Sequence, residues 1–324
     1  MRNEGSPHEV DNQGFFELSN CYDELNEKNR LLGWNVEYRQ LKPMEYRGGM
    51  AGLETHDATL LIEDVDVPSE VVGEFHGGVV WIMLGFSLAD ESIHVLGNDF
   101  GGSSAFLLNL GGEVDVITAP ETRLAHFCMD ASDFNLTWES LAPGINPFQF
   151  GYFGFIDVHS GCSPAFYRDV SCMLRGDYSR GVDREEYVST VLAMLALQAT
   201  SGSPIHNYRP RAAVRMRVRS RAREFIESNK HGSIRLSELC AYAGASMSTL
   251  TRVFREYYGM APAAYIRWCR MYDSFEFLRQ SDPQETSVGD IIRACGIRHP
   301  GRFASEYRQF FGESPKQTLG YRAS

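Results

Sequence analysis

Arginine and lysine, the residue types that neutralise phosphate groups, are concentrated in the last third of this 324-residue chain. Residues 209–324 contain 20 Lys and Arg against 11 Asp and Glu, a net charge of +9. Residues 1–208 contain 11 against 31, a net charge of −20, so the total of −11 conceals a basic C-terminal region. This asymmetry predicts that the C-terminal region binds a polyanion such as double-stranded DNA.

The basic region contains an internal repeat. Apolar, glycine and proline positions of a first copy recur 52 and then 53 residues later. The pairs are Leu239 and Ile291, Gly244 and Gly296, Leu250 and Phe303, Gly259 and Gly312, and Pro262 and Pro315. A one-residue insertion in the second turn accounts for the change in offset. Each copy predicts a helix-turn-helix, at residues 236–259 and 288–312.

The second helix of each copy has a recognisable start. Ser246 is placed to N-cap it in the first copy, and Pro300 suits the first turn of its counterpart. Helical spacing turns four apolar residues of the first copy inward: Leu250, Val253, Phe254 and Tyr257. The same spacing leaves four polar residues outward: Ser248, Thr251, Arg252 and Arg255.

Between the copies, Pro262 to Gln280 predicts a single helix of 19 residues. At ~1.5 Å per residue its length is about 28 Å. One turn of B-DNA is ~34 Å. A rigid spacer of this length would set the two helix-turn-helix units in successive major grooves on one face of a duplex.

The last third of the chain resembles the AraC/XylS family of transcription regulators, in the stretches AYAGASMSTLTRVFREYYGMAPAAYIRWCRMYDSFEFL and ACGIRHPGRFASEYRQFFGESPKQTLGYR. The resemblance covers roughly residues 213–322 and rests on two linked motifs with the expected separation. It implies that outward residues near the start of each second helix, the recognition helix, contact bases. In the first copy these are Ser248, Thr251 and Arg252.

The second copy departs from the family pattern. Arg298 stands where the family usually has Ser, and Ser305 where it often has a basic residue, so we expect Arg298, His299 and Arg302 to take over the contacts. Ile292 replaces a commonly small residue, which predicts altered packing against the recognition helix. The full set of DNA-contact candidates is Ser246, Ser248, Thr249, Thr251, Arg252, Arg255, Arg298, His299, Arg302, Ser305 and Arg308. For any one arginine the alternative is a solvated helix face.

The N-terminal region alternates short β-rich runs with Gly, Asp and Pro from about Gly33 to Asp133, which predicts a sandwich or barrel. The resemblance implies a cupin-like domain for effector sensing or dimerisation. The fold class expected is therefore two-domain α+β, with a β-rich, cupin-like domain and flanking helices at 1–205 and an all-α domain at 206–324. A helix over 185–200 carries an apolar stripe, including Leu192 and Leu195, for the intrachain core or a second subunit.

No catalytic or metal-binding pattern is present in the N-terminal region. The single histidines His56, His76, His94 and His126 lack the H-x-H pattern of a cupin metal centre, although Glu74 lies near His76. Nucleophile, phosphate-loop and dinucleotide motifs are also missing. We therefore expect no enzyme activity and no cofactor. Three aromatic residues would suit a small, partly apolar effector or simply form core: Trp81, Phe86 and Phe106.

Composition is that of an ordinary soluble protein, with 43% hydrophobic and 23% charged residues. The seven cysteines never form C-x-x-C, no apolar run is long enough to span a membrane, and the polar start lacks a secretory signal. We expect a cytoplasmic, effector-responsive regulator, more specifically an activator. Its expected partners are DNA, RNA polymerase and an unknown small molecule, with a possible homodimer and no membrane. The alternative is a cupin-type enzyme with a helical assembly domain, which would not need the charge of +9.

Overall fold

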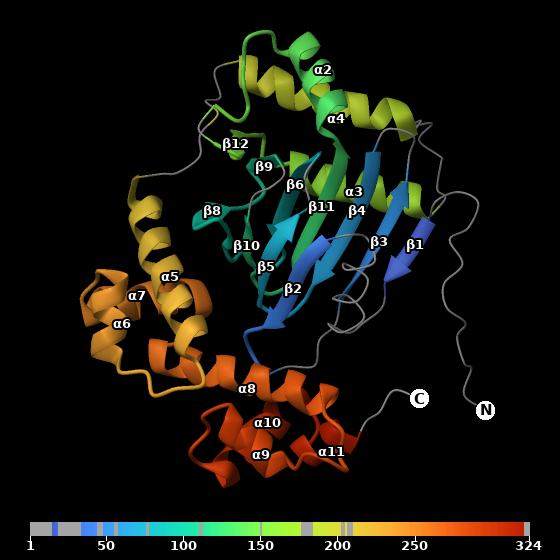
Figure 1. The fold of residues 1–324 in the computed structure, drawn as a ribbon. Coiled ribbons are helices and arrows are strands. Elements are labelled where there is room, and N and C mark those ends of the chain that lie inside the picture. The colour runs from blue at the N-terminus through green and yellow to red at the C-terminus, as the bar shows by residue number, and fades with distance from the viewer. Residues whose placement is uncertain are drawn as a thin grey trace, which may run out of the picture. The chain divides into compact units, whose positions relative to one another are not determined.

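The computed structural model describes residues 15–18, 34–43, 48–54, 58–75, 78–109, 113–149, 151–175, 184–201, 205 and 210–320. The chain divides into two compact units. Unit 1 comprises Met1–Tyr38 and Tyr46–Arg209, and unit 2 comprises Arg39–Glu45 and Pro210–Ser324. The β-rich N-terminal region and helical C-terminal region agree with the predicted fold class (Figure 1).

Unit 1 is built around two antiparallel sheets. The first has seven strands in the order β1 (Phe15–Leu18), β3 (Gly48–Glu54), β4 (Ala58–Val65), β11 (Thr122–Asp130), β6 (Val79–Ser87), β9 (Ser104–Asn109) and β12 (Phe153–Asp157). The second has five in the order β2 (Trp34–Gln40), β5 (Ser69–Phe75), β10 (Glu113–Ile117), β7 (Ile93–Val95) and β8 (Asn98–Phe100). Residues of β2 beyond Tyr38 are grouped with unit 2.

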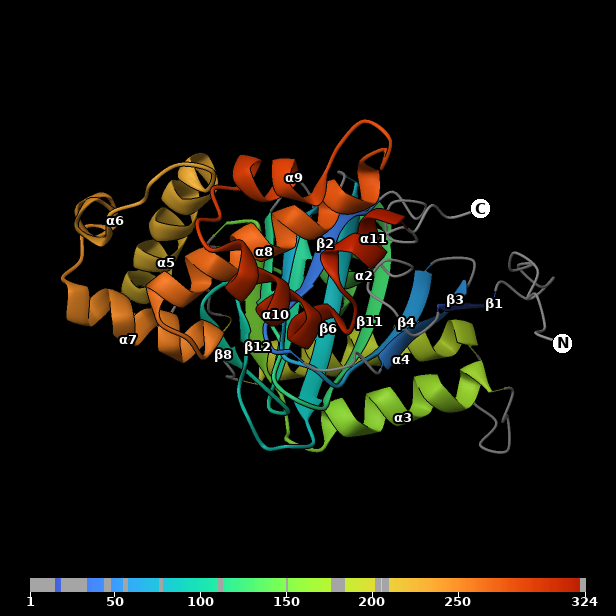
Figure 2. The same cartoon turned by 90° about the horizontal axis from the view of Figure 1, so that it is seen from below.

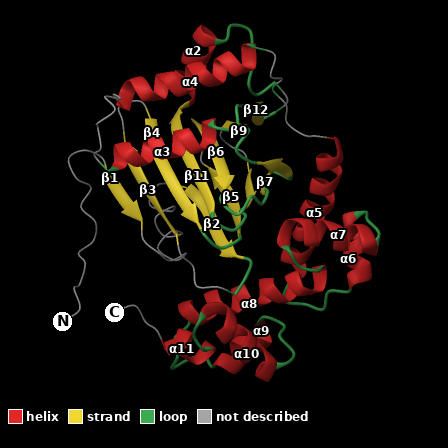
Figure 3. Cartoon of the chain, turned by 180° about the vertical axis from the view of Figure 1, so that it is seen from behind, coloured by secondary structure: helices red, strands yellow, loops and turns green. Residues whose placement is uncertain are grey.

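Alternation along the strands gives the seven-stranded sheet two different faces. On one face, residues such as Leu60, Ile82 and Phe127 form a core with helices α2 (Ala131–Leu141), α3 (Cys162–Leu174) and α4 (Arg184–Thr200). Figures 2 and 3 show α3 and α4 lying along this sheet. The opposite face, which we call the inner face, contains Glu63, Trp81, Phe106 and His126.

Helix α4 settles the role of its apolar stripe. Leu192 and Leu195 are 1% and 0% exposed and belong to the core shared with the sheet and with α2 and α3. Of the two alternatives for this stripe, the structure supports the intrachain core, because both side chains are covered within unit 1. Leu197 of the same helix is 61% exposed.

The three aromatic residues singled out in the sequence do not line one site. Trp81 and Phe106 lie on the inner face, with their rings edge to face at 6.0 Å. Phe86 is an odd number of residues from Trp81 on β6, so it points to the opposite face and meets Tyr167 of α3. Of the three, only Trp81 and Phe106 therefore share a face of the sheet.

Unit 2 is helical in its C-terminal part. Its helices are α5 (Pro210–Asn229), α6 (Leu236–Ala243), α7 (Met247–Tyr258), α8 (Pro262–Gln280), α9 (Val288–Ala294), α10 (Pro300–Phe311) and α11 (Pro315–Gly320). The first helix-turn-helix is α6 and α7, the second is α9 and α10, and α8 joins them (Figure 1). Left-handed glycines end the helices or turns at the repeat positions Gly244, Gly259, Gly296 and Gly312.

Helix α8 is buried on more than one side, because both helix-turn-helix units pack against it. Tyr265 meets Phe254 and Tyr258 of α7, whereas Tyr272 meets Phe310 and Phe311 at the end of α10. Both contacts rest on large rings, which contribute heavily to core stability. The linker helix is thus a shared core element rather than a solvated spacer.

A short N-terminal segment completes unit 2. The indole Nε1 of Trp268 donates to the Gln40 carbonyl oxygen at 2.9 Å, and the Gln40 backbone N–H donates to the Tyr272 hydroxyl at 2.7 Å. The Gln40 side-chain amide donates to the Phe310 carbonyl oxygen at 3.0 Å. Gln40 therefore ties α8 to the end of α10, a role that sequence periodicity does not reveal.

Among the residues that the structure describes, no helix is long and apolar enough to cross a membrane. The described part of the chain also contains no group of three or more His, Cys, Asp or Glu side chains arranged to hold a metal ion. The six described cysteines are free thiols. Burial raises the pKa of the Cys128 thiol to about 12, so this group is an unreactive part of the core.

Candidate nucleic-acid interface

The first recognition helix, α7, begins at the predicted cap. Ser246 Oγ accepts a hydrogen bond from the Thr249 backbone N–H at 3.2 Å. The four residues expected to face inward, Leu250, Val253, Phe254 and Tyr257, are all buried. Cap and core together fix the rotation of α7 about its axis.

The opposite face of α7 is open. A shallow, open groove along this face of α7 is lined by Ser248, Thr251, Arg252 and Arg255, together with Met247 and Glu256. The structure therefore brings together four of the predicted contact residues. Hydroxyl groups here can donate or accept, and guanidinium groups present several N–H donors in a planar fork, which matches guanine edges and phosphates.

Two other candidates on α7 have a structural task. The Ser246 hydroxyl is used by the cap and also donates to Thr249 Oγ1 at 3.0 Å. The Ser248 hydroxyl also lies 3.0 Å from Ser246 Oγ, so all three hydroxyl groups are linked at the start of α7, and Arg252 lies on the exposed side of the helix. Ser246 and Thr249 position the groove residues through the first turn.

The second recognition helix, α10, begins at Pro300 and buries Phe303, Tyr307 and Phe310. Arg302, Ser305 and Arg308 are exposed. Arg302 Nε lies 2.7 Å from Glu306 Oε1, one helical turn further on. A DNA contact by Arg302 would have to compete with this exposed ion pair, which is a weak type of interaction.

Arg298 and His299 precede α10 and are both exposed. Arg298 Nη2 donates to Ser233 Oγ at 3.2 Å, in the segment between α5 and α6. His299 occupies the N-cap position of α10, but its side chain makes no capping hydrogen bond. The structure thus separates the candidates of this copy into a turn pair, Arg298 and His299, and a helix face with Arg302, Ser305 and Arg308.

Two basic residues of unit 2 serve the fold, and sequence reasoning counted them only as charge. Arg219 is completely buried, donates through Nε to the Tyr258 hydroxyl at 3.0 Å, and lies over the Tyr257 and Tyr258 rings. Arg270 donates to the backbone carbonyls of Lys230 at 2.7 Å and Gly296 at 3.2 Å, and to that of Gly232. Desolvation and nearby Arg298 lower the pKa of Arg270. The charge available to a polyanion is therefore smaller than the sequence count.

Acid–base pairs hold the same region together. Lys230 Nζ lies 2.8 Å from Glu227 and 2.8 Å from Asp273 of α8, and Glu227 also meets Arg39 at 3.5 Å. Burial raises the pKa of Glu227, but the hydrogen bond from Lys230 and the charge of Arg39 outweigh it, and the net shift is downward. These charges connect α5, α8 and the Arg39 segment.

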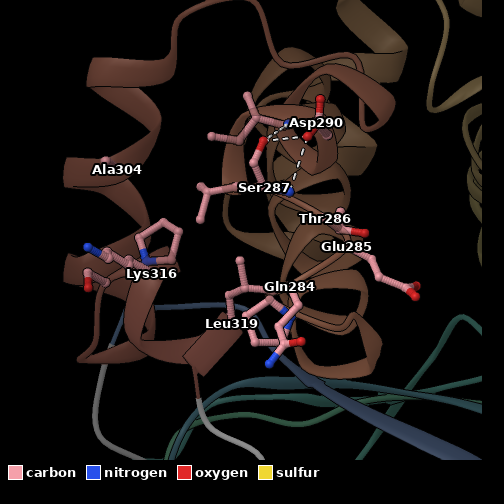
Figure 4. A pocket seen from close by; sticks show the side chains of 13 residues that line it. Gln284, Glu285, Thr286, Ser287, Asp290, Ala304, Lys316 and Leu319 are labelled. Atoms are coloured by element: carbon pink, nitrogen blue, oxygen red, sulfur yellow. Dashed lines mark hydrogen bonds between the residues drawn. The ribbon is translucent and has the colours of Figure 1, made fainter.

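A second groove, of about 640 Å³, lies within the second helix-turn-helix and is bordered by residues of α9, α10 and α11 (Figure 4). Ser287 and Asp290 form a capping box at its wall, with the Asp290 backbone N–H donating to Ser287 Oγ at 3.2 Å. The hydrogen bond from the Ser287 side chain is the main reason that the pKa of Asp290 is lowered. Ile292, the unusual residue of α9, is buried and lines this groove together with Ala304 of the recognition helix.

The family model that matches this chain covers the two helix-turn-helix units. Residues 239–320 match a family model described as a helix-turn-helix domain. A probable thc operon regulatory protein of Rhodococcus erythropolis is 29% identical over 137 residues, which are 41% of this chain and 41% of that protein. A XylDLEGF operon transcriptional activator of Pseudomonas putida is 39% identical over 101 residues, 31% of this chain and 30% of that protein. The matches thus span less than half the length of these relatives.

Among the solved structures, a match is found to a transcriptional regulator of Chromobacterium violaceum described as having an AraC-type DNA-binding domain. It is 26% identical, and the match covers 35% of this chain and 97% of that one, with a TM-score of 0.32.

Proposed function

We propose that this chain, whose residues 239–320 form an AraC/XylS-type helix-turn-helix domain, is a sequence-specific DNA-binding transcription regulator. The observation that carries the proposal is the α7 groove, where Ser248, Thr251, Arg252 and Arg255 converge on the exposed side of a capped, well-packed recognition helix. Base-edge recognition needs such a helix to present several donors and acceptors at once.

Different roles follow for the groove residues. Ser248, Thr251 and Arg252 occupy the first half of α7 and are proposed to read bases, whereas Arg255 lies further along and is proposed to contact phosphate. In the second copy, Arg298 and His299 would approach from the turn, and Arg302, Ser305 and Arg308 from the helix. Arg302 would exchange its Glu306 partner for the nucleic acid.

Unit 1 is proposed to sense a small molecule and to alter transcription without transforming that molecule. Because the Pseudomonas putida relative is a transcriptional activator, this chain is also proposed to activate transcription, through RNA polymerase. A homodimer and a location in the cytoplasm, where the DNA target lies, complete the proposal. A ligand changes the output only by its difference in affinity for two states of the protein.

The proposal is tested by an electrophoretic shift assay with the full chain on the DNA that flanks its own gene. Specific binding should resist an excess of unrelated duplex. If an excess of unrelated duplex competes away all of the shifted complex, sequence-specific recognition is contradicted.

A further inference from the structure

The inner face of the seven-stranded sheet contains a buried polar cluster. Glu63 of β4 and His126 of β11 are 1% and 3% exposed. The strand register pairs Glu63 with Leu124 and His126 with Leu61. Because alternate residues of a strand point to the same face, Glu63 and His126 both lie on the inner face. Trp81 of β6 shares the face, since it pairs with Cys128, two residues after His126.

The polar atoms of this cluster are only partly satisfied. The Tyr38 hydroxyl donates to Glu63 Oε2 at 3.1 Å, and His126 Nε2 lies 3.4 Å from the same oxygen without the geometry of a hydrogen bond. Within the described residues, Glu63 Oε1 and both ring nitrogens of His126 have no hydrogen-bond partner. Buried polar groups in proteins are almost always paired, so this arrangement calls for a further partner.

The surroundings indicate the shape of that partner. The rings of Trp81 and His126 are stacked, 5.2 Å apart with an angle of 22°, and Phe106 meets the Trp81 ring edge-on. Flat rings beside a few polar atoms are the usual lining of a small-molecule site.

Charge indicates the chemistry of the head group. One Glu63 oxygen already accepts the hydrogen bond from Tyr38 and the other is an unpartnered carboxyl oxygen, so the site suits a ligand that donates a hydrogen bond. Arg123 is the one Lys or Arg within β4, β6, β9 and β11, and it pairs with Asp64 and Asp66 on the side away from Glu63. An anionic ligand would therefore meet a carboxylate with no compensating cation from these strands.

We propose that this inner face binds a small aromatic molecule with a hydrogen-bond-donating head, an amine or a hydroxyl, held by Glu63 and His126 with its ring against Trp81. The assignment rests on the proposed role of unit 1 as a sensor and names its ligand class. It excludes aromatic carboxylates as the preferred ligands.

The test uses the full chain with benzylamine and phenol as probes and benzoate as their anionic counterpart. Binding is measured by saturation-transfer NMR and calorimetry in the absence of DNA. Benzylamine and phenol should bind saturably, and benzoate at least tenfold more weakly. Equal or tighter binding of benzoate would overturn the proposal.

Variants locate the site. Glu63→Gln should weaken benzylamine at least tenfold, since it removes the charge and keeps the side-chain shape. The matched control is Asp64→Asn, which removes the next carboxylate on the same strand, where Asp64 faces Tyr167 and Arg123 instead. His126→Gln provides a second variant if Glu63→Gln fails to fold, as judged by circular dichroism. Unchanged binding in either folded inner-face variant would overturn the assignment.

The two proposals fail separately. No probe binding at millimolar concentration by a chain that still binds its DNA specifically would overturn the ligand site alone. Saturable, Glu63-dependent probe binding by a chain without specific DNA binding would uphold the site and contradict the regulatory function.

Discussion

The Ser246 hydroxyl accepts a hydrogen bond from the Thr249 backbone N–H at 3.2 Å, and this contact fixes the residue at which α7 begins. With the start fixed, Leu250, Val253 and Phe254 point into the core, where each is 0% exposed. Because the buried residues fix how α7 is rotated about its axis, they also fix which residues face the groove. Ser246, which does not line the groove, therefore helps to determine the residues that do.

Removing Arg252 should affect specificity. Arg252→Ala is expected to weaken binding to the specific site by about 1 to 3 kcal/mol and to relax preference at one base position, as for loss of a bidentate guanine contact. Arg255→Ala should weaken all sequences similarly. Fluorescence anisotropy on a set of single-base variants of the site measures both effects, with exposed Arg267→Ala on α8 as the charge-matched control. Equal loss of base preference in the Arg252 and Arg255 variants would refute this division.

Salt should weaken binding steeply. With roughly 6 to 10 phosphate contacts, affinity is expected to fall by about 10³ to 10⁵ between 50 and 200 mM salt. The measurement calls for the full chain rather than residues 210–324, because Gln40 supplies partners to Trp268, Tyr272 and Phe310. A salt-independent affinity would show that phosphate contacts are not the source of binding.

Arg270 should stabilise unit 2. Arg270→Ala removes three hydrogen bonds to backbone carbonyls and leaves those acceptors without their partner. We expect a loss of about 2 to 4 kcal/mol in the free energy of unfolding, which is less than three times the roughly 1.5 kcal/mol of one charged hydrogen bond because Arg270 is only partly buried. Urea unfolding followed by circular dichroism measures it. Arg270→Lys should recover only part of the loss because it cannot reach three carbonyls with a planar fork.

The control for Arg270 is Arg267→Ala, an exposed position of the same helix. Its unfolding midpoint should remain close to that of the unaltered chain. Equal destabilisation by the two substitutions would mean that general charge or helix propensity, rather than the carbonyl contacts, is responsible.

Leu195 and Leu197 of α4 should behave in opposite ways. Leu195 is fully buried in the core of unit 1, so Leu195→Ala is expected to cost about 2 to 5 kcal/mol in the free energy of unfolding. Leu197→Ala should change stability little, because its side chain is 61% exposed. Thermal unfolding compares the two. A larger effect at Leu197 would indicate that a partner covers this position in solution, which sedimentation would then reveal as a change in mass.

Much of unit 2 could be predicted because its signals are local. The cap at Ser246, the glycine positions of the repeat and the helix over Pro262–Gln280 each depend on residues within a few turns of one another. The inward and outward faces of α7 follow from a helical period and one known start. Such patterns are visible in a single sequence.

Long-range partners could not be predicted in this way. Gln40 bonds to residues 228 to 270 positions later, and nothing in a local pattern connects them. Arg219 was counted among the available charges, whereas three-dimensional packing buries it under Tyr257 and Tyr258. Helical periodicity likewise shows that Leu192 and Leu195 share one face of a helix, but it does not show which part of the protein packs against that face.

The same limit applies to the inner face of the β sheet. His126 is a single histidine in the sequence, and its proximity to Glu63 depends on strand pairing across more than sixty positions. Only the register places the two side chains on one face with Trp81.

Selection of bound duplexes from a random pool by the full chain tests sequence-specific recognition most directly. Two helix-turn-helix units on one duplex should enrich a common motif with two recognised segments about one helical turn, roughly 10.5 base pairs, apart. The same selection with the Arg252→Ala variant should lose preference at one position in one segment. Pools that stay random after repeated rounds with the folded, unaltered chain would contradict sequence-specific DNA recognition.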